Sequence, residues 1–157
     1  MKKYTLLILL LIAVVVFSAC SAGSGDTAKP LSEVFDTIRS KVELSEMNIF
    51  SDISVLERYY GITEDEAIDF AGGINNSGVE QEEIVLILAA DNEAKDKITE
   101  TLENRRSAKL NENINYNPAQ AQIIERSKVE INGMYVSLII SENADDIEKI
   151  YHSELGI

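Results

Sequence analysis

The chain has 157 residues but only one cysteine, one histidine and two prolines, and it has no tryptophan. A single thiol allows no disulfide within the chain, so packing must stabilise the fold. Cys20 precedes any segment that could fold, and His152 lies near the far end, so we predict no catalytic role for this thiol. The few aromatic residues also make a sugar-binding cleft a poor expectation.

Basic residues are also scarce, since 14 Lys and Arg stand against 27 Asp and Glu, for a formal net charge of −13. Nucleic-acid binding depends on clustered basic side chains that release counterions, and adhesion to an anionic membrane leaflet needs the same charge. The composition therefore argues against both kinds of partner. An acidic composition of this kind usually serves solubility.

Catalytic signatures are missing as well, because the sequence contains no G-x-S-x-G, no H-E-x-x-H and no Gly-rich phosphate loop. Acidic clusters at 64–66, 80–83 and 145–146 lack the alternating spacing of a calcium loop. Most of these acids are better explained as charges favoured at helix N-termini. We therefore predict no metal site and no cofactor.

The N-terminus has a clear pattern: Lys2 and Lys3 are followed by an uncharged apolar run from Leu6 to Phe17 and then by small residues. This layout is typical of a secretory signal peptide, here residues 1–19, and the run is short for a membrane span. A cysteine directly after the small residues resembles a bacterial lipobox, although Phe17 stands where leucine is usual. An ordinary signal peptide with an incidental cysteine and an uncleaved anchor are the alternatives.

A lipobox implies that diacylglycerol is joined to the Cys20 thiol and that this cysteine becomes the new N-terminus. Two acyl chains anchor a protein durably, so we expect it on the outer face of the cell membrane. Residues 20–29 form a Gly/Ser-type tether with a root-mean-square span of about 17 Å. Residues 30–157 form one domain, and the mature chain, without Lys2 and Lys3, has a formal net charge of −15.

The remaining pattern predicts an α+β fold, with helices packed on a small, mainly antiparallel sheet that ends in a C-terminal hairpin. A continuous apolar run at 83–90 predicts a central strand covered on both faces. The segment 67–78 is ambiguous because it contains paired glycines. Helices are expected at 30–43, at 52–60 with Gly61 as a left-handed cap, from 91 or 92 to about 110, from 118, and from 143 to 151.

The hairpin prediction rests on Asn132-Gly133, the strongest short turn signal in the chain. If these two residues form the turn, Ile131 faces Met134 and Val129 faces Val136. One face then carries the apolar residues, and a slip of one residue would expose them.

The assembled motifs resemble a family of lipoproteins from low-GC Gram-positive bacteria known only as domain of unknown function 4358. The similar stretches are "YYGI" at 59–62, "EEIVLILAADNEA" at 82–94, "LENRRSAKLNENINYNP" at 102–118 and "INGMYVSLIIS" at 131–141, together with the Cys20 lipobox. The resemblance implies a Gram-positive source, surface localisation and a compact domain. It brings no catalytic residues.

Candidate binding residues come from two places. A helix over 92–110 has a narrow apolar stripe, and Arg105 or Arg106 falls where that stripe would continue. Such an arginine can bind a carboxylate or phosphate of a small anionic ligand or partner, with Tyr116 nearby in sequence. The alternative is that the arginine stem packs on the sheet while its head reaches water or a nearby Glu. Tyr59 and Tyr60 form the second candidate, since one can pack inward while the other exposes its ring; a purely structural helix end is the alternative.

The sequence thus predicts a lipid-anchored, extracytoplasmic α+β module that binds a ligand or protein without catalysing a reaction. Its expected partners are the membrane, through the lipid on Cys20, and an unidentified protein or small anionic ligand. A small cell-envelope hydrolase using Asp and Glu carboxylates is the alternative, and a purely structural role is a third possibility.

Overall fold

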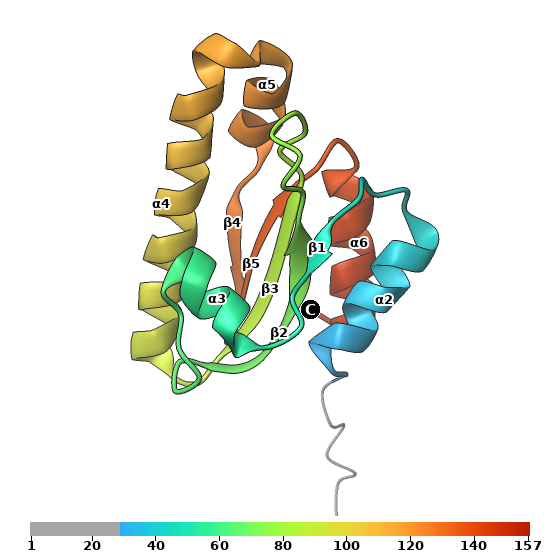
Figure 1. Ribbon diagram of the computed structural model, residues 1–157. Coiled ribbons are helices and arrows are strands. Elements are labelled where there is room, and N and C mark those ends of the chain that lie inside the picture. Colours follow the sequence, from blue (N-terminus) through green and yellow to red (C-terminus); the bar gives the residue numbers. More distant parts are fainter. Residues whose placement is uncertain (1–28) are drawn as a thin grey trace, which may run out of the picture.

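The computed structural model describes residues 29–157, in which a five-stranded sheet lies between two groups of helices (Figure 1). The predicted α+β class is confirmed; the predicted signal peptide, Cys20 and nearly all of the predicted tether lie outside the described residues. None of the helices in residues 29–157 has the length and hydropathy to cross a membrane. The elements are α2 (Leu31–Lys41), β1 (Asn48–Ile49), α3 (Ile53–Tyr60), β2 (Ala67–Ile74), β3 (Glu83–Ala89), α4 (Asn92–Tyr116), α5 (Pro118–Arg126), β4 (Val129–Asn132), β5 (Tyr135–Ile140) and α6 (Ala144–Leu155).

The sheet has the strand order β1-β2-β3-β5-β4, and each neighbouring pair is antiparallel. The apolar run is the central strand β3, as predicted, with β2 on one side and β5 on the other. The ambiguous segment is the strand β2, whose eight residues pair with β3 throughout most of their length. Its glycines fit because neighbouring segments approach the backbone closely there.

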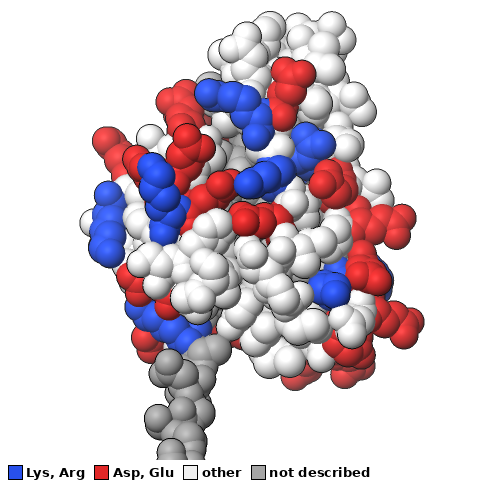
Figure 2. All heavy atoms as spheres, turned by 180° about the vertical axis from the view of Figure 1, so that it is seen from behind, with Lys and Arg blue, Asp and Glu red and all other residues white. Residues whose placement is uncertain are grey.

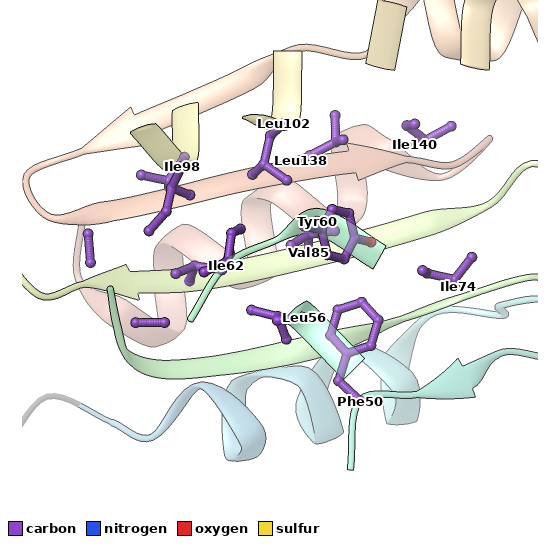
Figure 3. Packing of buried hydrophobic residues seen from close by; sticks show 14 of the residues in the cluster. Phe50, Leu56, Tyr60, Ile62, Ile74, Val85, Ile98, Leu102, Leu138 and Ile140 are labelled. Carbon is purple, nitrogen blue, oxygen red and sulfur yellow. The ribbon is translucent and has the colours of Figure 1, made fainter. Parts of the chain in front are cut away.

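Each face of the sheet carries its own hydrophobic core. Val85 and Ile87 of β3 point into a cluster with α3, α4 and α5, in which Ile98 and Leu102 are fully buried (Figure 3). Ile84 and Leu86 point to the other face, where α2 and α6 pack. Both faces are covered, so successive residues of β3 are apolar instead of alternating with polar ones.

Helix boundaries follow the local signals except at the end of α4 and at the end of α6, which runs to Leu155, four residues beyond the predicted Tyr151. Gly61 ends α3 with φ +68°, and Pro118 begins α5 after the Asn117 cap, as expected. Helix α4 continues six residues beyond the predicted end at Leu110. Its apolar stripe stops there, but the next turns are held by polar contacts, including the buried Asn113, whose Nδ2 donates to the Lys109 carbonyl. Apolar periodicity does not record contacts of that kind.

The predicted hairpin forms, but its turn is one residue later than expected. Gly133 and Met134 make the turn, so Ile131 pairs with Val136 and Val129 pairs with Leu138. Each strand-β4 residue therefore has a partner two positions beyond the predicted one. A shift of two leaves every side chain on its predicted face, so the apolar pattern cannot distinguish the two registers.

Candidate functional site

The first candidate site is a buried carboxylate at the start of β3. Glu83 is completely buried, and its Oε1 accepts hydrogen bonds from the Tyr60 hydroxyl at 2.9 Å and from Arg105 Nε at 3.2 Å. Arg105 Nη2 donates to the other oxygen at 3.1 Å, and its guanidinium lies 5.8 Å from the centre of the Tyr60 ring. The fold thus joins two predicted site residues, Tyr60 and Arg105, through an acid that sequence reasoning left out.

Lys109 is the fourth member of this cluster, one helical turn after Arg105 on α4. Its Nζ donates to Glu83 Oε2 at 2.6 Å and to the Gln81 carbonyl at 3.0 Å, and the residue is only 6% exposed. The sequence places Lys109 four residues after Arg105 on the same helix face, which is the signal that could have found it. We refer to Tyr60, Glu83, Arg105 and Lys109 as the Glu83 cluster.

Electrostatics keep Glu83 ionised and Tyr60 protonated. Burial alone would raise the pKa of Glu83, but Lys109 and Arg105 outweigh burial and lower it below its ordinary value. Burial and the negative Glu83 together hold the pKa of the Tyr60 hydroxyl well above its ordinary value, so this hydroxyl remains a donor. The charged groups of the cluster therefore pair with one another. For Arg105 this matches the structural alternative given above, in which the arginine head pairs with a nearby Glu instead of a ligand.

We expect Glu83 to make the stability of the domain depend on pH. A carboxylate with a lowered pKa in the folded state stabilises fully above its unfolded value, near 4.5, and loses that contribution as the pH falls through the folded value. The difference in unfolding free energy between the wild type and Glu83→Gln should therefore shrink on acidification. Urea unfolding of the full chain, followed by circular dichroism at a series of pH values, measures it. A difference that stays constant from neutral pH into the acid range would contradict the assignment.

The other predicted binding residues lie apart from the Glu83 cluster. Arg106 pairs with Glu103 at 3.2 Å, and the Tyr59 hydroxyl accepts from Asn76 Nδ2 at 3.2 Å. Tyr116 is 91% exposed where α4 meets α5. On the face shown in Figure 2 the uppermost part of the molecule is uncharged, while acidic and basic side chains are mixed below it. Ligand binding by these residues remains a prediction.

The second candidate site is a cavity of about 350 Å³ at one end of the sheet. It lies between the end of α2, the β2–β3 loop, α5 and the start of α6, all of which meet at the upper end of Figure 1. Among residues 29–157, four carboxylates line it and no basic side chain does. The lining residues are Glu43, Leu44, Ser45, Glu80, Glu82, Gln120, Ile123, Ser141, Glu142 and Asn143. We call this the distal cavity, because the described chain enters the domain at the opposite end.

Glu82 holds the walls of the distal cavity together. Its Oε2 accepts from the Ser45 backbone N–H at 2.7 Å, and its Oε1 accepts from the Ser141 hydroxyl. The buried Asn75 then donates from Nδ2 to the Ser45 hydroxyl at 2.9 Å and to Glu80 Oε2 at 3.0 Å. Residues distant in sequence are thereby fixed around one space, which gives the cavity a defined shape.

One short acidic run supplies both candidate sites. In the sequence, 80–83 is Glu-Gln-Glu-Glu, a cluster of three acids. Successive side chains in extended chain point in opposite directions, so Glu82 reaches the distal cavity while Glu83 enters the core under α4. The sequence shows the cluster of acids but not which of them enters the core and which lines the cavity. Among residues 29–157, no group of three or more His, Cys, Asp or Glu side chains is arranged to hold a metal ion.

Comparison with known proteins gives one match. Residues 40–141 match the family described as Domain of unknown function (DUF4358), a range that contains β1 to β5, the whole Glu83 cluster and most of the distal cavity. No curated protein and no solved structure matches the chain. Since the matched range covers more than half of the sequence, the chain belongs to the DUF4358 family.

Proposed function

We propose that this protein is a lipoprotein anchored through Cys20 to the outer face of a bacterial cell membrane, with a domain that binds a ligand or protein without catalysis. The lipobox and its Gram-positive setting come from the sequence around Cys20 and from the family resemblance. The observation that carries the binding role is the distal cavity, which has a volume within the range of ligand sites.

The position of the distal cavity supports this proposal. The first described residues lead into α2, whose 11 residues run for about 16 Å, and the cavity is lined by residues just after its far end. A lipid attached upstream of α2 would thus leave the cavity facing away from the membrane (Figure 1). In that orientation the cavity is open to a ligand or protein outside the cell.

The carboxylates of the cavity support binding more than hydrolysis. A two-carboxylate hydrolase needs one carboxyl held protonated in apolar surroundings. Glu82 instead accepts hydrogen bonds on both oxygens, from the Ser45 backbone N–H and the Ser141 hydroxyl, in polar surroundings. Its position between Ser45 and Ser141 is that of a structural support.

We expect Cys20→Ala to abolish lipid attachment. In a Gram-positive host fed a clickable fatty acid, the wild-type chain should carry the label and have the size of the cleaved form. The variant should be unlabelled and remain at precursor size, because the peptidase acts on the lipid-modified cysteine. Ser21→Ala, one residue away, is the matched control and should behave as the wild type. A cleaved variant that still fractionates with membranes would refute the anchor.

A further inference from the structure

We propose that His152 and Glu130 form a pH-sensitive clasp, which holds helix α6 against the β4–β5 hairpin more tightly when His152 is protonated. The two residues come from different elements, His152 from the last turn of α6 and Glu130 from the edge strand β4. His152 Nε2 lies 3.1 Å from Glu130 Oε1, and only 31% and 21% of the two side chains are exposed. This inference does not depend on the proposed binding function.

The polar atoms of this clasp lack hydrogen-bond partners. Within residues 29–157, His152 Nε2, Glu130 Oε2 and the Tyr151 hydroxyl are buried and form no hydrogen bond. Glu130 Oε1 accepts from Asn132 Nδ2 at 3.0 Å, so one oxygen of the carboxylate is bonded and the other is not. Buried polar atoms in folded proteins nearly always have partners. A protonated imidazole donates from both ring nitrogens, so protonation of His152 supplies the missing donor beside Glu130.

Most other charged side chains of α6 already have partners of opposite charge. The pairs are Lys149 with Asp146, Glu148 with Lys128, and Glu154 with Lys29 and Lys41 from the two ends of α2. From β5, the hydroxyl groups of Tyr135 and Ser137 act on that of Tyr151. Burial raises the pKa of Tyr151 above its ordinary value, and the negative Glu130 adds to this shift, so the Tyr151 hydroxyl stays uncharged. Among residues 29–157, Glu130 is therefore the one acid at ion-pair distance from His152.

Protonation of His152 is expected near neutral pH, where carboxylates and lysines keep their charges. An imidazolium beside a carboxylate, in the last turn of a helix, is stabilised by both. The clasp therefore contributes stability on the acid side of neutral pH and loses it as the pH rises. This range lies above the acid range in which Glu83 loses its contribution, so the two effects are separable. Helix α6 follows Asn143 in the wall of the distal cavity, so the clasp holds an element that borders this cavity.

The test is a double-mutant cycle on the full chain with His152→Gln, Glu130→Gln and the double variant. Urea unfolding, followed by circular dichroism at about pH 5.5 and about pH 8.5, gives four unfolding constants at each pH. Their coupling factor is the ratio by which the double variant departs from the product of the two single effects. We expect a factor of about three- to tenfold at the lower pH and less than about twofold at the higher pH. Both side chains are partly exposed, so the variants should remain folded.

The matched control is the cycle of Lys128→Met and Glu148→Gln, which removes an ion pair between the residue before β4 and α6 that contains no histidine. Lysine and glutamate keep their charges over this pH range, so the coupling factor of this pair should agree within about twofold at the two pH values. An equal coupling of His152 with Glu130 at both pH values would overturn the inference, because that contact would not depend on a proton. A coupling factor near one at the lower pH would overturn it as well.

NMR of the same chain assigns the titrating group. The chain has a single histidine, so its ring signals are unambiguous. We expect the backbone amides of Glu130 and Tyr151 to shift in the same titration step as the His152 ring, and to show no such step in His152→Gln. Amide shifts that persist in this variant would assign the step to another group and would overturn the clasp.

Discussion

Glu83→Ala should destabilise the domain by about 3–5 kcal/mol. The substitution leaves Lys109 and Arg105 beside each other without the carboxylate that both contact, at 2.6 Å and 3.1 Å. Lys109 is buried, so water cannot replace the lost partner, and the ammonium must either deprotonate or move outward. Urea unfolding of the full chain, followed by circular dichroism, measures the loss.

The control for this prediction removes the charges as a pair. In Glu83→Gln/Lys109→Met the buried site keeps its approximate volume and loses one charge of each sign, so the loss should be smaller than for Glu83→Ala. The remaining Arg105 is partly exposed and can reach solvent. If Glu83→Ala costs less than about 1 kcal/mol, the cluster has the energetics of a surface ion pair and our description of it is wrong.

The fold could largely be predicted because its strongest signals are local. The unbroken apolar run of β3 specifies a central strand, and Gly61 and Asn117-Pro118 specify helix ends through backbone geometry within a few residues. The end of α4 and the hairpin register depend on other information. Helix α4 continues past Leu110 through polar residues such as the buried Asn113, whose amide donates to the Lys109 carbonyl, and a register shift of two residues preserves the apolar face.

For the candidate sites, too, local signals predict single residues but not how these residues come together. Arg105 and Tyr60 were predicted as site residues from their type and local setting, yet the carboxylate that hydrogen-bonds to both is Glu83, more than 20 residues from either one. The distal cavity brings together residues from 43 to 143, none of which forms a motif. Such a site follows from the strand order, which places the end of α2 and the start of α6 at the same end of the sheet. The strand order cannot be read from a single sequence, so the sequence alone could not predict this cavity.

The structure shows where the charged residues lie and which of them are paired, which composition alone does not. Three basic residues of α4 form ion pairs within the domain: Arg105 and Lys109 pair with Glu83, and Arg106 pairs with Glu103. Within residues 29–157, the lining of the distal cavity contains four glutamates and no basic residue. Acidity that looks like a general aid to solubility is therefore concentrated, in part, around the distal cavity.

Gly72→Ala should cost about 2–6 kcal/mol, which combines backbone strain with overpacking. Gly72 lies in β2 with φ +146°, a region that other residues rarely adopt. A Cβ atom there would lie 1.9 Å from the carbonyl oxygen of Ile84 and 2.9 Å from Cε2 of Phe50. The nearest obstacle is backbone of the central strand, so it cannot move aside without breaking the β2–β3 ladder.

Gly78→Ala is the matched control, because Gly78 also has a positive φ, +76°, but nothing lies within 4 Å of its added Cβ. It should cost only about 1–2 kcal/mol, the strain of a left-handed residue in an open loop. Urea unfolding of both variants separates the two contributions, and hydrogen exchange of the β3 amides should accelerate in Gly72→Ala alone. Equal losses would mean that the close approach of β2 to β3 does not limit the residue at this position. A larger loss at Gly72 would instead explain why 67–78, a weak strand by its sequence, contains paired glycines. The missing side chain at Gly72 lets β2 lie against both the central strand and Phe50. Strand β2 thereby completes the sheet on which the distal cavity is built.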